Sequence, residues 1–381
     1  MNTWTPQVFA PYPGHPDVLL ARVAARSAAF EGTSAADGDR VIVGSAAGHD
    51  REQVMRGARG ELLERIGNVM AGRAAEAGGG VVATRAELGV TAQAVLAPPV
   101  RPDSRRLWVR GRTLTGRPVY VAAGTVFLQH RPPPGCEALP PAGSSGLASH
   151  TDMQSAARHA AWEVLERDLI RRSWYGLAGR PPRALVAGPG GPLGDLFEAQ
   201  GLVATAFALP APPGAECVVV CLHRPDGTGQ TFGARCGPPG TFESLVGKAA
   251  YEALMVRWSM GSAVARATWE RWRGEGPPRT AVQHALWAYH QQDSLSLWKV
   301  AGATSATAPA SRASSPVDPL DVLARHTGRD VVLVETDGTP ARDAGVSVVR
   351  VLAPGALPLP SGPHPAGFES ASGHAHPHPF G

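Results

Sequence analysis

The chain contains the sequence Glu-x-x-Glu-Arg twice, and the two copies are 102 positions apart. They occupy residues 61–65 and 163–167. Side chains three residues apart lie on one face of a helix, so each copy presents two carboxylates together. If the two helices pack against each other, four carboxylates aim at one point, and such a cluster is unstable without cations. The candidate metal ligands are Glu61, Glu64, Glu163 and Glu166.

The metal that this set of ligands favours is Mg²⁺. Carboxylate oxygens are hard ligands, and Mg²⁺ typically binds through a few of them together with substrate phosphates. Arg65 and Arg167 directly follow the second carboxylate of each pair, and a guanidinium group can donate two hydrogen bonds to phosphate oxygens. The chain has no Gly-x-x-x-x-Gly-Lys-Ser/Thr loop, so a nucleotide would have to bind without one. The structural alternative is that these glutamates are solvated and pair with neighbouring arginines.

The two copies belong to a longer repeat. Residues 44–65 and 146–167 are identical at nine of 22 aligned positions. Each begins with a Gly/Ala-rich turn and then has an aspartate, Asp50 or Asp152, in the position of a helix cap. The expected helices are therefore about 51–71 and 153–175. Repetition in register favours a shared site over two solvated helix faces.

The remaining segments predict a mixture of helices and strands. We expect a short helix within 17–30 and a long third helix at 241–273, which carries a partial echo of the repeat. Cys217 and Cys221, four apart in a valine-rich run, fit one buried face of a core strand. The strand-like segments are 39–44, 80–84, 106–110, 117–128, 184–188, 201–209, 217–223, 331–335 and 347–352.

Because helices and strands alternate irregularly, the predicted fold class is α+β. We expect an N-terminal segment (1–38), a catalytic domain (39–353) and a Pro/His-rich tail (354–381). Within the domain, residues 302–316 are low in bulky side chains, which predicts a mobile loop.

Composition narrows the class of protein. The 381 residues carry a net charge of only +4, with no basic stripe interleaved with aromatic residues, which argues against nucleic-acid binding. There is no apolar run long enough for a membrane span and no secretory signal, so we expect a cytoplasmic protein. The four cysteines contain no Cys-x-x-Cys pair.

Residues 144–168 (SSGLASHTDMQSAARHAAWEVLERD) resemble the signature of YcaO-domain proteins, in which a Gly/Ala turn precedes a helix ending in Glu-x-x-Glu-Arg-Asp. Residues 44–65 resemble an earlier element of that family, and AAYEALMVR (249–257) resembles a later one. The ending, with VVRVLAPG and HPHPFG, is similar to the family's Pro-rich C-terminus. The resemblance covers roughly residues 40–381 and implies a YcaO-type fold.

The resemblance also implies an ATP-dependent enzyme that acts on a peptide backbone. In this family a nucleophile adds to an amide carbonyl, and ATP phosphorylates the resulting oxyanion so that the oxygen leaves as phosphate. With Cys, Ser or Thr as the nucleophile, the product is a thiazoline or oxazoline. Carried over to this chain, the four glutamates hold Mg²⁺, Arg167 contacts phosphate as a catalytic residue, and Arg257 is a further candidate for a phosphate contact. Together with Arg65, these arginines are the expected nucleotide contacts.

Several positions depart from the family pattern. Ser145 precedes Gly146 where Asn is usual, His150 replaces a glycine, and Met255 replaces a glutamine. Ser155 stands where a further family carboxylate commonly completes the metal shell, with Thr151 nearby. Both hydroxyls could still contact the nucleotide or metal, but a site with one fewer carboxylate should hold Mg²⁺-ATP more weakly.

Three interpretations of the histidines at the C-terminus are open. They could form a metal-binding tract, lie in a solvated tail, or fold back toward the active site, as the resemblance implies. In the last case His378 would serve as a general acid or base. Phe380 and Gly381, where the family prefers proline, depart from the pattern.

The resemblance also implies partners. We expect a ribosomal precursor peptide as substrate, a leader-peptide-binding (E1-like) partner protein, and possibly a flavin-dependent dehydrogenase, in an oligomer or hetero-complex. Two alternatives stay open: the same ATP chemistry could form a thioamide or an amidine, or the chain could be a catalytically silent scaffold that binds peptide and partner enzymes.

Overall fold

The structure is a computed structural model that describes residues 4–30, 40–91, 103–140, 142–185, 189–291, 294–301, 317–359 and 376–380. The predicted mobile loop lies outside these residues. The helices are α1 (Arg51–Ala74), α2 (Arg85–Leu88), α3 (Ala123–Val126), α4 (Met153–Trp174), α5 (Gly191–Ala199), α6 (Phe242–Met260), α7 (Ala263–Trp272), α8 (Ala281–Gln291), α9 (Ser294–Ala301), α10 (Pro319–Thr327) and α11 (Thr339–Asp343). Among the described residues, none of these helices is long and apolar enough to cross a membrane.

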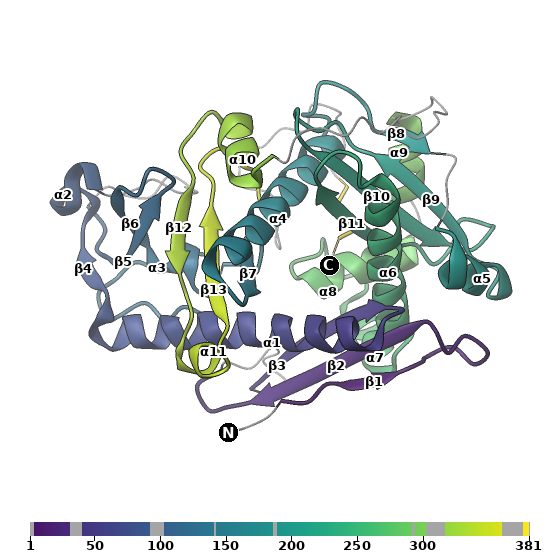
Figure 1. Ribbon diagram of the computed structural model, residues 1–381, viewed down its shortest axis with the longest axis horizontal. Coiled ribbons are helices and arrows are strands. Elements are labelled where there is room, and N and C mark those ends of the chain that lie inside the picture. Colours follow the sequence, from purple (N-terminus) through teal and green to yellow (C-terminus); the bar gives the residue numbers. More distant parts are fainter. Residues whose placement is uncertain are drawn as a thin grey trace.

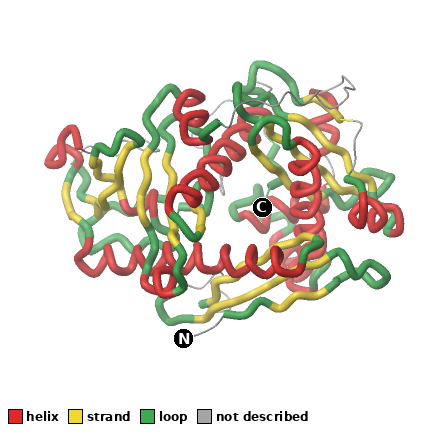
Figure 2. The backbone as a smooth tube through the Cα atoms, viewed as in Figure 1, coloured by secondary structure: helices red, strands yellow, loops and turns green. Residues whose placement is uncertain are grey.

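Three sheets lie around the long helices, which confirms the α+β class (Figures 1 and 2). The first has the order β1-β2-β3, the second β11-β10-β9-β8, and the third β4-β5-β12-β13-β7 with β6 beside β5. The strands are β1 (Gln7–Phe9), β2 (Leu19–Arg26), β3 (Val41–Gly48), β4 (Val81–Ala83), β5 (Arg106–Thr113), β6 (Pro118–Ala122), β7 (Leu147–His150), β8 (Arg183–Leu185), β9 (Val203–Ala208), β10 (Glu216–His223), β11 (Thr231–Gly237), β12 (Val332–Glu335) and β13 (Ser347–Leu352).

The repeat corresponds to three strand–turn–helix units rather than two. They are β3–α1, β7–α4 and β11–α6. The helix of the third unit, α6, contains the partial echo of the repeat noted at 241–273. Each helix also contacts the strand of the next unit: α1 contacts β7, α4 contacts β11, and α6 contacts β3. The three units therefore close a ring, and α1, α4 and α6 surround the middle of the molecule (Figure 1).

Glycines bring each strand close to its own helix. A β-carbon at Gly44 of β3 would lie 2.2 Å from the carbonyl oxygen of Ala58 on α1. In the third unit, a β-carbon at Gly233 would lie 2.1 Å from the carbonyl oxygen of Ala249. Gly146, with φ +79°, begins the second unit and leaves no room for a side chain against Val164. Only glycine permits these approaches.

The two predicted helices with Glu-x-x-Glu-Arg are confirmed, and their caps explain where they begin. Asp50 accepts a hydrogen bond of 2.9 Å from the backbone amide of Gln53 at the start of α1. Asp152 accepts one of 2.8 Å from Ser155 at the start of α4. These side chains satisfy amides that have no partner inside the helix.

Two predicted helices are wrong. Residues 17–30 contain β2, which pairs with β3 in antiparallel orientation along its whole length. Its alanines favour a helix, but its buried side chains alternate with exposed ones, and the pairing with β3 decides the outcome. The long third helix is broken at Gly261, after which Ser262 caps a separate helix, α7.

The largest core cluster lies between α4 and the sheet that contains β10 and β11. Cys217 and Cys221 both face this cluster from β10 and are buried, as predicted. The end of the described chain also packs here: Phe380 lies with its ring centroid 5.8 Å from that of Phe232 and 6.0 Å from that of Trp298. Residues 378–380 are therefore buried, and this end of the described chain is not a solvated tail.

Candidate active site

A row of carboxylates crosses the ring of helices. Each of the following glutamates interacts electrostatically with its neighbour in the row. The order is Glu61, Glu64, Glu163, Glu166 and Glu252, which come from α1, α4 and α6. Two helices thus contribute the four predicted glutamates, and α6 adds a fifth that the sequence reasoning did not assign to the site.

Glu61 is tied to the strand of its own unit. Its carboxylate accepts a hydrogen bond of 2.5 Å from the backbone amide of Ser45. Arg65 pairs with Glu61 at 2.6 Å and donates to the carbonyl oxygen of Val43 at 2.7 Å. Two of the donors of Arg65 are therefore used within the first unit, which fixes one end of the row.

Glu64 and Glu163 meet where α1 and α4 face each other. Burial, followed by the charge of Glu163, raises the pKa of Glu64 well above its ordinary value. Burial also raises the pKa of Glu163, while Arg167 and Arg350 oppose the rise. Two neighbouring carboxyls whose pKa values are both raised mark a place that is short of positive charge.

Glu166 is the most buried of the five glutamates, with 2% of its surface exposed. One carboxylate oxygen, Oε2, accepts a hydrogen bond of 3.0 Å from the backbone amide of Cys236 on β11. Oε1 is buried and has no hydrogen-bond partner among the described residues; its ion pair with Arg167 is long, at 3.7 Å. Burial raises the pKa of Glu166 to about 7, and Arg167 opposes that rise.

Glu252 completes the row on α6. The backbone amide of Ala234 donates to it at 3.3 Å, just as Ser45 donates to Glu61. Two guanidinium groups approach its carboxylate: Arg167 at 3.9 Å and Arg235 at 3.9 Å. This end of the row therefore carries two cations that pair only loosely and can reorient toward an anion.

Three functional candidates were missed from the sequence: Glu252, Arg235 and Arg350. The sequence could have identified Glu252, because this residue occupies the glutamate position in the partial echo of the repeat. Arg350 lies on β13, in a segment predicted only as a strand, and Arg235 lies on β11, for which no strand was predicted. Arg350 is 4% exposed, and its Nε and Nη1 have no hydrogen-bond partner among the described residues.

The donor set fits Mg²⁺ and a nucleotide. Raised carboxyl pKa values and the orphaned Oε1 of Glu166 show that positive charge is missing. In the part of the chain that the structure describes, no group of three or more His, Cys, Asp or Glu side chains is close enough together to hold a metal ion as it stands. The glutamates form a row instead of the single point expected from the sequence, which leaves coordination positions for phosphate oxygens and water.

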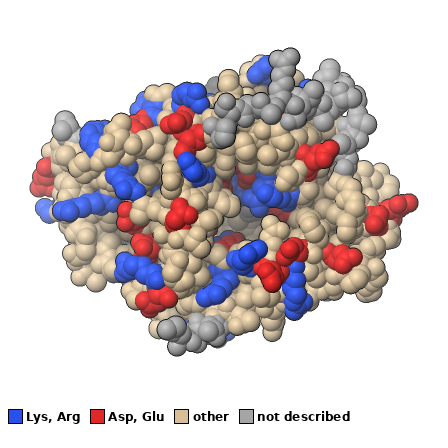
Figure 3. All heavy atoms as spheres, viewed as in Figure 1, with Lys and Arg blue, Asp and Glu red and all other residues tan. Residues whose placement is uncertain are grey.

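Arginines and glutamates are mixed in the hollow at the middle of the molecular face (Figure 3). Deep burial and alternation of charge make this a place where a polyanion with bound cations can replace water. The guanidinium groups that accompany the row are Arg65, Arg167, Arg235 and Arg350.

Thr151 and Ser155 lie at the opposite end of α4 from its buried C-terminal half. Thr151 is exposed, and its hydroxyl is 3.1 Å from Nδ1 of His150. Ser155 is in the first turn of α4, eight residues before Glu163, which corresponds to about 12 Å along the helix. The structure does not bring either hydroxyl to the carboxylate row, and their contact with nucleotide stays a prediction.

Arg257 lies apart from the row. Its Nη1 donates to the carbonyl oxygen of Gly229 at 2.5 Å, and its guanidinium lies 5.9 Å from the centroid of the Tyr289 ring. Arg257 follows Glu252 by five residues, so the two side chains point roughly 140° apart around α6. Its role as a phosphate ligand stays a prediction.

His378 is buried inside the protein, with 3% of its surface exposed. Its ring stacks on that of His284 from α8 at 3.9 Å, and its carbonyl oxygen is 2.8 Å from Nδ1 of His284. The carbonyl oxygen of His376 accepts a hydrogen bond from Trp174 at the end of α4. The tail therefore folds back onto the helix that carries Glu163 and Glu166. His364 and His374 lie outside the described residues.

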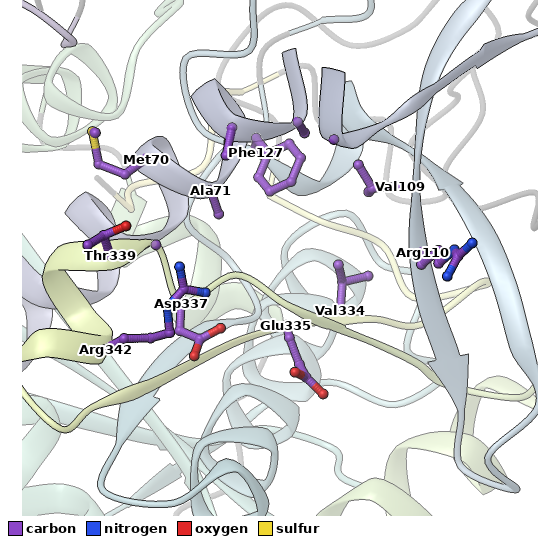
Figure 4. A pocket seen from close by; sticks show the side chains of 14 residues that line it. Met70, Ala71, Val109, Arg110, Phe127, Val334, Glu335, Asp337, Thr339 and Arg342 are labelled. Carbon is purple, nitrogen blue, oxygen red and sulfur yellow. The ribbon is translucent and has the colours of Figure 1, made fainter. Parts of the chain in front are cut away.

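A separate cavity of about 270 Å³ lies beside the second half of α1 (Figure 4). Ala71, Phe127 and Val334 form apolar parts of its wall, and Asp337 and Arg342 lie together on one side. None of the predicted site residues lines this cavity. It is therefore distinct from the carboxylate row.

Known proteins resemble this chain in sequence and in fold. Residues 45–357 match the model of a family described as YcaO cyclodehydratase, ATP- and Mg²⁺-binding. An uncharacterized protein of Methanothermobacter thermautotrophicus is 28% identical over 262 residues, which are 65% of this chain and 64% of that protein. The chain thus spans slightly less than two thirds of that relative.

Solved structures share the fold. YcaO from Methanopyrus kandleri, bound with AMPPCP and Mg²⁺, is similar with a TM-score of 0.63 and 19% identity, over 93% of this chain and 86% of that one. A heterocyclase in complex with substrate and cofactor has a TM-score of 0.70 and 17% identity, over 93% of this chain and 50% of that one. The E. coli microcin synthetase McbBCD complex with pro-MccB17 bound has a TM-score of 0.67 and 13% identity, over 100% of this chain and 98% of that one.

The family model covers most of the chain and the same fold recurs in these structures, so the chain belongs to the YcaO cyclodehydratase family, whose members bind ATP and Mg²⁺.

Proposed function

We propose that the protein is an ATP-dependent cyclodehydratase subunit that converts Cys, Ser or Thr residues of a ribosomal precursor peptide to thiazoline or oxazoline. The observation that carries this proposal is the row of five glutamates, interleaved with arginines, that the three repeated units direct into the middle of the ring. A YcaO fold alone would be kept by an inactive scaffold, but a row of charged, buried carboxylates is costly unless it binds cations.

In the proposed reaction, the thiol or hydroxyl of the substrate side chain loses its proton and adds to the carbonyl carbon of the preceding peptide bond. The new C–S or C–O bond converts the carbonyl oxygen to an oxyanion, and the γ-phosphoryl group of ATP is transferred to that oxygen, which releases ADP. Loss of the amide proton and departure of phosphate then form the C=N bond of the azoline. The net result is loss of one water from the peptide at the expense of one ATP.

In this proposal the glutamates bind the metal and the arginines contact phosphate. Glu61, Glu64, Glu163, Glu166 and Glu252 would hold Mg²⁺, which neutralises phosphate charge and orients the triphosphate when it is bound. In this proposal Arg167 and Arg235 leave their long contacts with Glu252 and donate to phosphate oxygens during transfer.

The tail contacts α4 at Trp174, on the same helix as Glu163 and Glu166. Nδ1 of His378 accepts a hydrogen bond of 3.4 Å from the amide of Phe380, which places the ring proton of a neutral imidazole on Nε2. We propose that His378 moves the amide or nucleophile proton of the substrate. A leader-peptide-binding partner would deliver the peptide, because none of the described elements forms a separate peptide-binding domain.

The deciding experiment is mass spectrometry of a precursor peptide co-expressed with this chain and its partner protein. Loss of the mass of one water per modified residue supports azoline formation, whereas the mass gain of sulfur replacing oxygen would identify a thioamide-forming enzyme. If the complex with peptide binds no ATP in the presence of Mg²⁺, the protein is a scaffold and the proposed enzyme activity is wrong.

A further inference from the structure

Cys217 on β10 and Cys236 on β11 lie directly opposite each other. They are register partners in the antiparallel pair, and both are buried, with 2% and 8% of their surfaces exposed. Both side chains face the core cluster under α4. Because register partners point to the same face of a sheet, their Cβ atoms lie about 4.5–5.5 Å apart, which makes the two thiols neighbours.

The backbone hydrogen bonds identify the type of pair. The carbonyl oxygen of Cys217 accepts from Leu209 on the β9 side, and the amide of Cys236 donates to Glu166 on α4. Both groups therefore point away from the partner strand, which defines a non-hydrogen-bonded pair. Opposite Cα atoms in such a pair are about 4.5 Å apart, within the 4.4–6.8 Å range usual for disulfides, as a general order of magnitude.

This pair is coupled to the active site through one hydrogen bond. The amide of Cys236 is the hydrogen-bond donor that holds Oε2 of Glu166, while Oε1 has no hydrogen-bond partner among the described residues. Arg235, the residue before Cys236, contacts Glu252. A change in the position of this part of β11 therefore acts on both ends of the Glu166–Glu252 segment of the row.

We propose that Cys217 and Cys236 are an oxidation site at which a reversible cross-strand disulfide weakens Mg²⁺-nucleotide binding at the adjacent carboxylate row. A disulfide fixes the two sulfurs about 2.05 Å apart and favours Cα atoms about 5.5–6 Å apart, whereas this type of pair starts at about 4.5 Å, so β11 must shift relative to β10 at Cys236. That shift breaks the hydrogen bond from Cys236 to Glu166. The effect on nucleotide rests on the proposed function; the disulfide does not.

The oxidant class is a hydroperoxide, because a buried pair admits a small molecule more readily than another protein. Hydrogen peroxide oxidises one thiol to a sulfenic acid and releases one water. The second thiol attacks that sulfur, the S–S bond forms, and a second water leaves. The two cysteines are oxidised and the peroxide is reduced; a dithiol reductant reverses the step.

The test treats the full-length protein with hydrogen peroxide and maps its disulfides by mass spectrometry. We expect a linked Cys217–Cys236 peptide after the treatment and none in the reduced protein, where all four cysteines are free thiols. In parallel, calorimetry with Mg²⁺ and a non-hydrolysable ATP analogue should show affinity weakened about tenfold, the loss expected for one hydrogen bond to a charged group. A dithiol should restore it.

The matched control is Cys221→Ala, because Cys221 is buried on the same face of β10 but lies opposite Phe232. This variant should respond to peroxide like the wild type, whereas Cys217→Ala should keep its affinity after the treatment. Absence of the linked peptide, or equal loss of affinity in Cys217→Ala, overturns the inference, and so does a linked peptide with unchanged affinity. If the reduced wild type binds no nucleotide, the proposed function fails, and peptide mapping still decides whether the disulfide forms.

Discussion

Gly44 on β3 lies against Ala58 on α1 so closely that a β-carbon on the glycine would be 2.2 Å from the alanine carbonyl oxygen. The same approach recurs between Gly233 and Ala249 in the third unit. In both units the amide that follows the glycine donates to a glutamate of the row, Glu61 in one and Glu252 in the other. The glycines of the repeat are therefore part of the site, because they set the distance between strand amides and helix carboxylates.

Gly44→Ala should destabilise the protein. A methyl group at this position overlaps the backbone of α1, so β3 and α1 must separate, at a cost of about 2 kcal/mol or more in the free energy of unfolding. Chemical denaturation with circular dichroism measures the change. Gly247→Ala on α6 is the control: a β-carbon there meets nothing within 4 Å, so the variant should gain up to ~1 kcal/mol from helix propensity. Equal stabilities of the two variants would refute the role of the close approach.

Glu166→Gln should change how stability depends on pH. The pKa of Glu166 is about 7 in the folded protein and 4.5 in the absence of the fold, so the folded state binds the proton more tightly. That stabilising effect is complete below pH 4.5 and is lost as the pH rises through 7. Each unit of pKa difference corresponds to ~1.4 kcal/mol, which sets the order of magnitude.

The measurement is thermal or chemical unfolding of both proteins across this range of pH without metal. Relative to Glu166→Gln, the wild type should lose stability between pH 4.5 and 7 and then reach a plateau. Mg²⁺ with nucleotide should narrow the difference above pH 7, because a cation stabilises the ionised carboxylate. Parallel curves for the two proteins would show that Glu166 ionises normally.

Glu252→Gln should abolish peptide modification and weaken Mg²⁺-nucleotide binding by at least about tenfold, since a neutral amide is a poor ligand for a hard cation. Glutamine is nearly isosteric, so the unfolding transition should stay within about 0.5 kcal/mol of the wild type, as for a substitution without steric change. Titration calorimetry and mass spectrometry of the peptide measure the two effects. Glu270→Gln is the control, because Glu270 is exposed on α7 and pairs only with Arg273 among the described residues. Normal turnover by Glu252→Gln would remove this residue from the site.

Local signals predicted the helices that carry the first four glutamates, because Asp50 and Asp152 cap them within the chain itself. Arg235 and Arg350 could not be found in this way. They lie on β11 and β13, which pack against α4 although they are far from it in sequence, and only that packing brings them to the glutamates. Arg257 shows the converse: it shares a motif with Glu252 but points to another side of α6.

The helix predicted within residues 17–30, where the structure has β2, was wrong for a related reason. Residues 19–26 have the alanines and leucines of a helix, and their fate depends on pairing with β3. The tail is a third case. The sequence did not decide where the tail lies. In the structure Phe380 is buried against Phe232 and Trp298, which come from segments far apart in the chain, so only the folded structure defines this contact.

His378→Gln should slow peptide modification by about tenfold or more, the lower range expected for loss of a general acid or base, while Mg²⁺-ATP affinity changes little. Glutamine can keep the packing between His284 and the core but cannot transfer a proton near neutral pH. The rate is measured by mass spectrometry at saturating ATP, and affinity by calorimetry. His376→Gln is the matched control, since the side chain of His376 is exposed and its backbone carbonyl, which accepts from Trp174, is unaffected. If His378→Gln lowers ATP affinity and modification to the same extent, His378 supports the nucleotide site structurally, and proton transfer must be assigned to the substrate or to another residue.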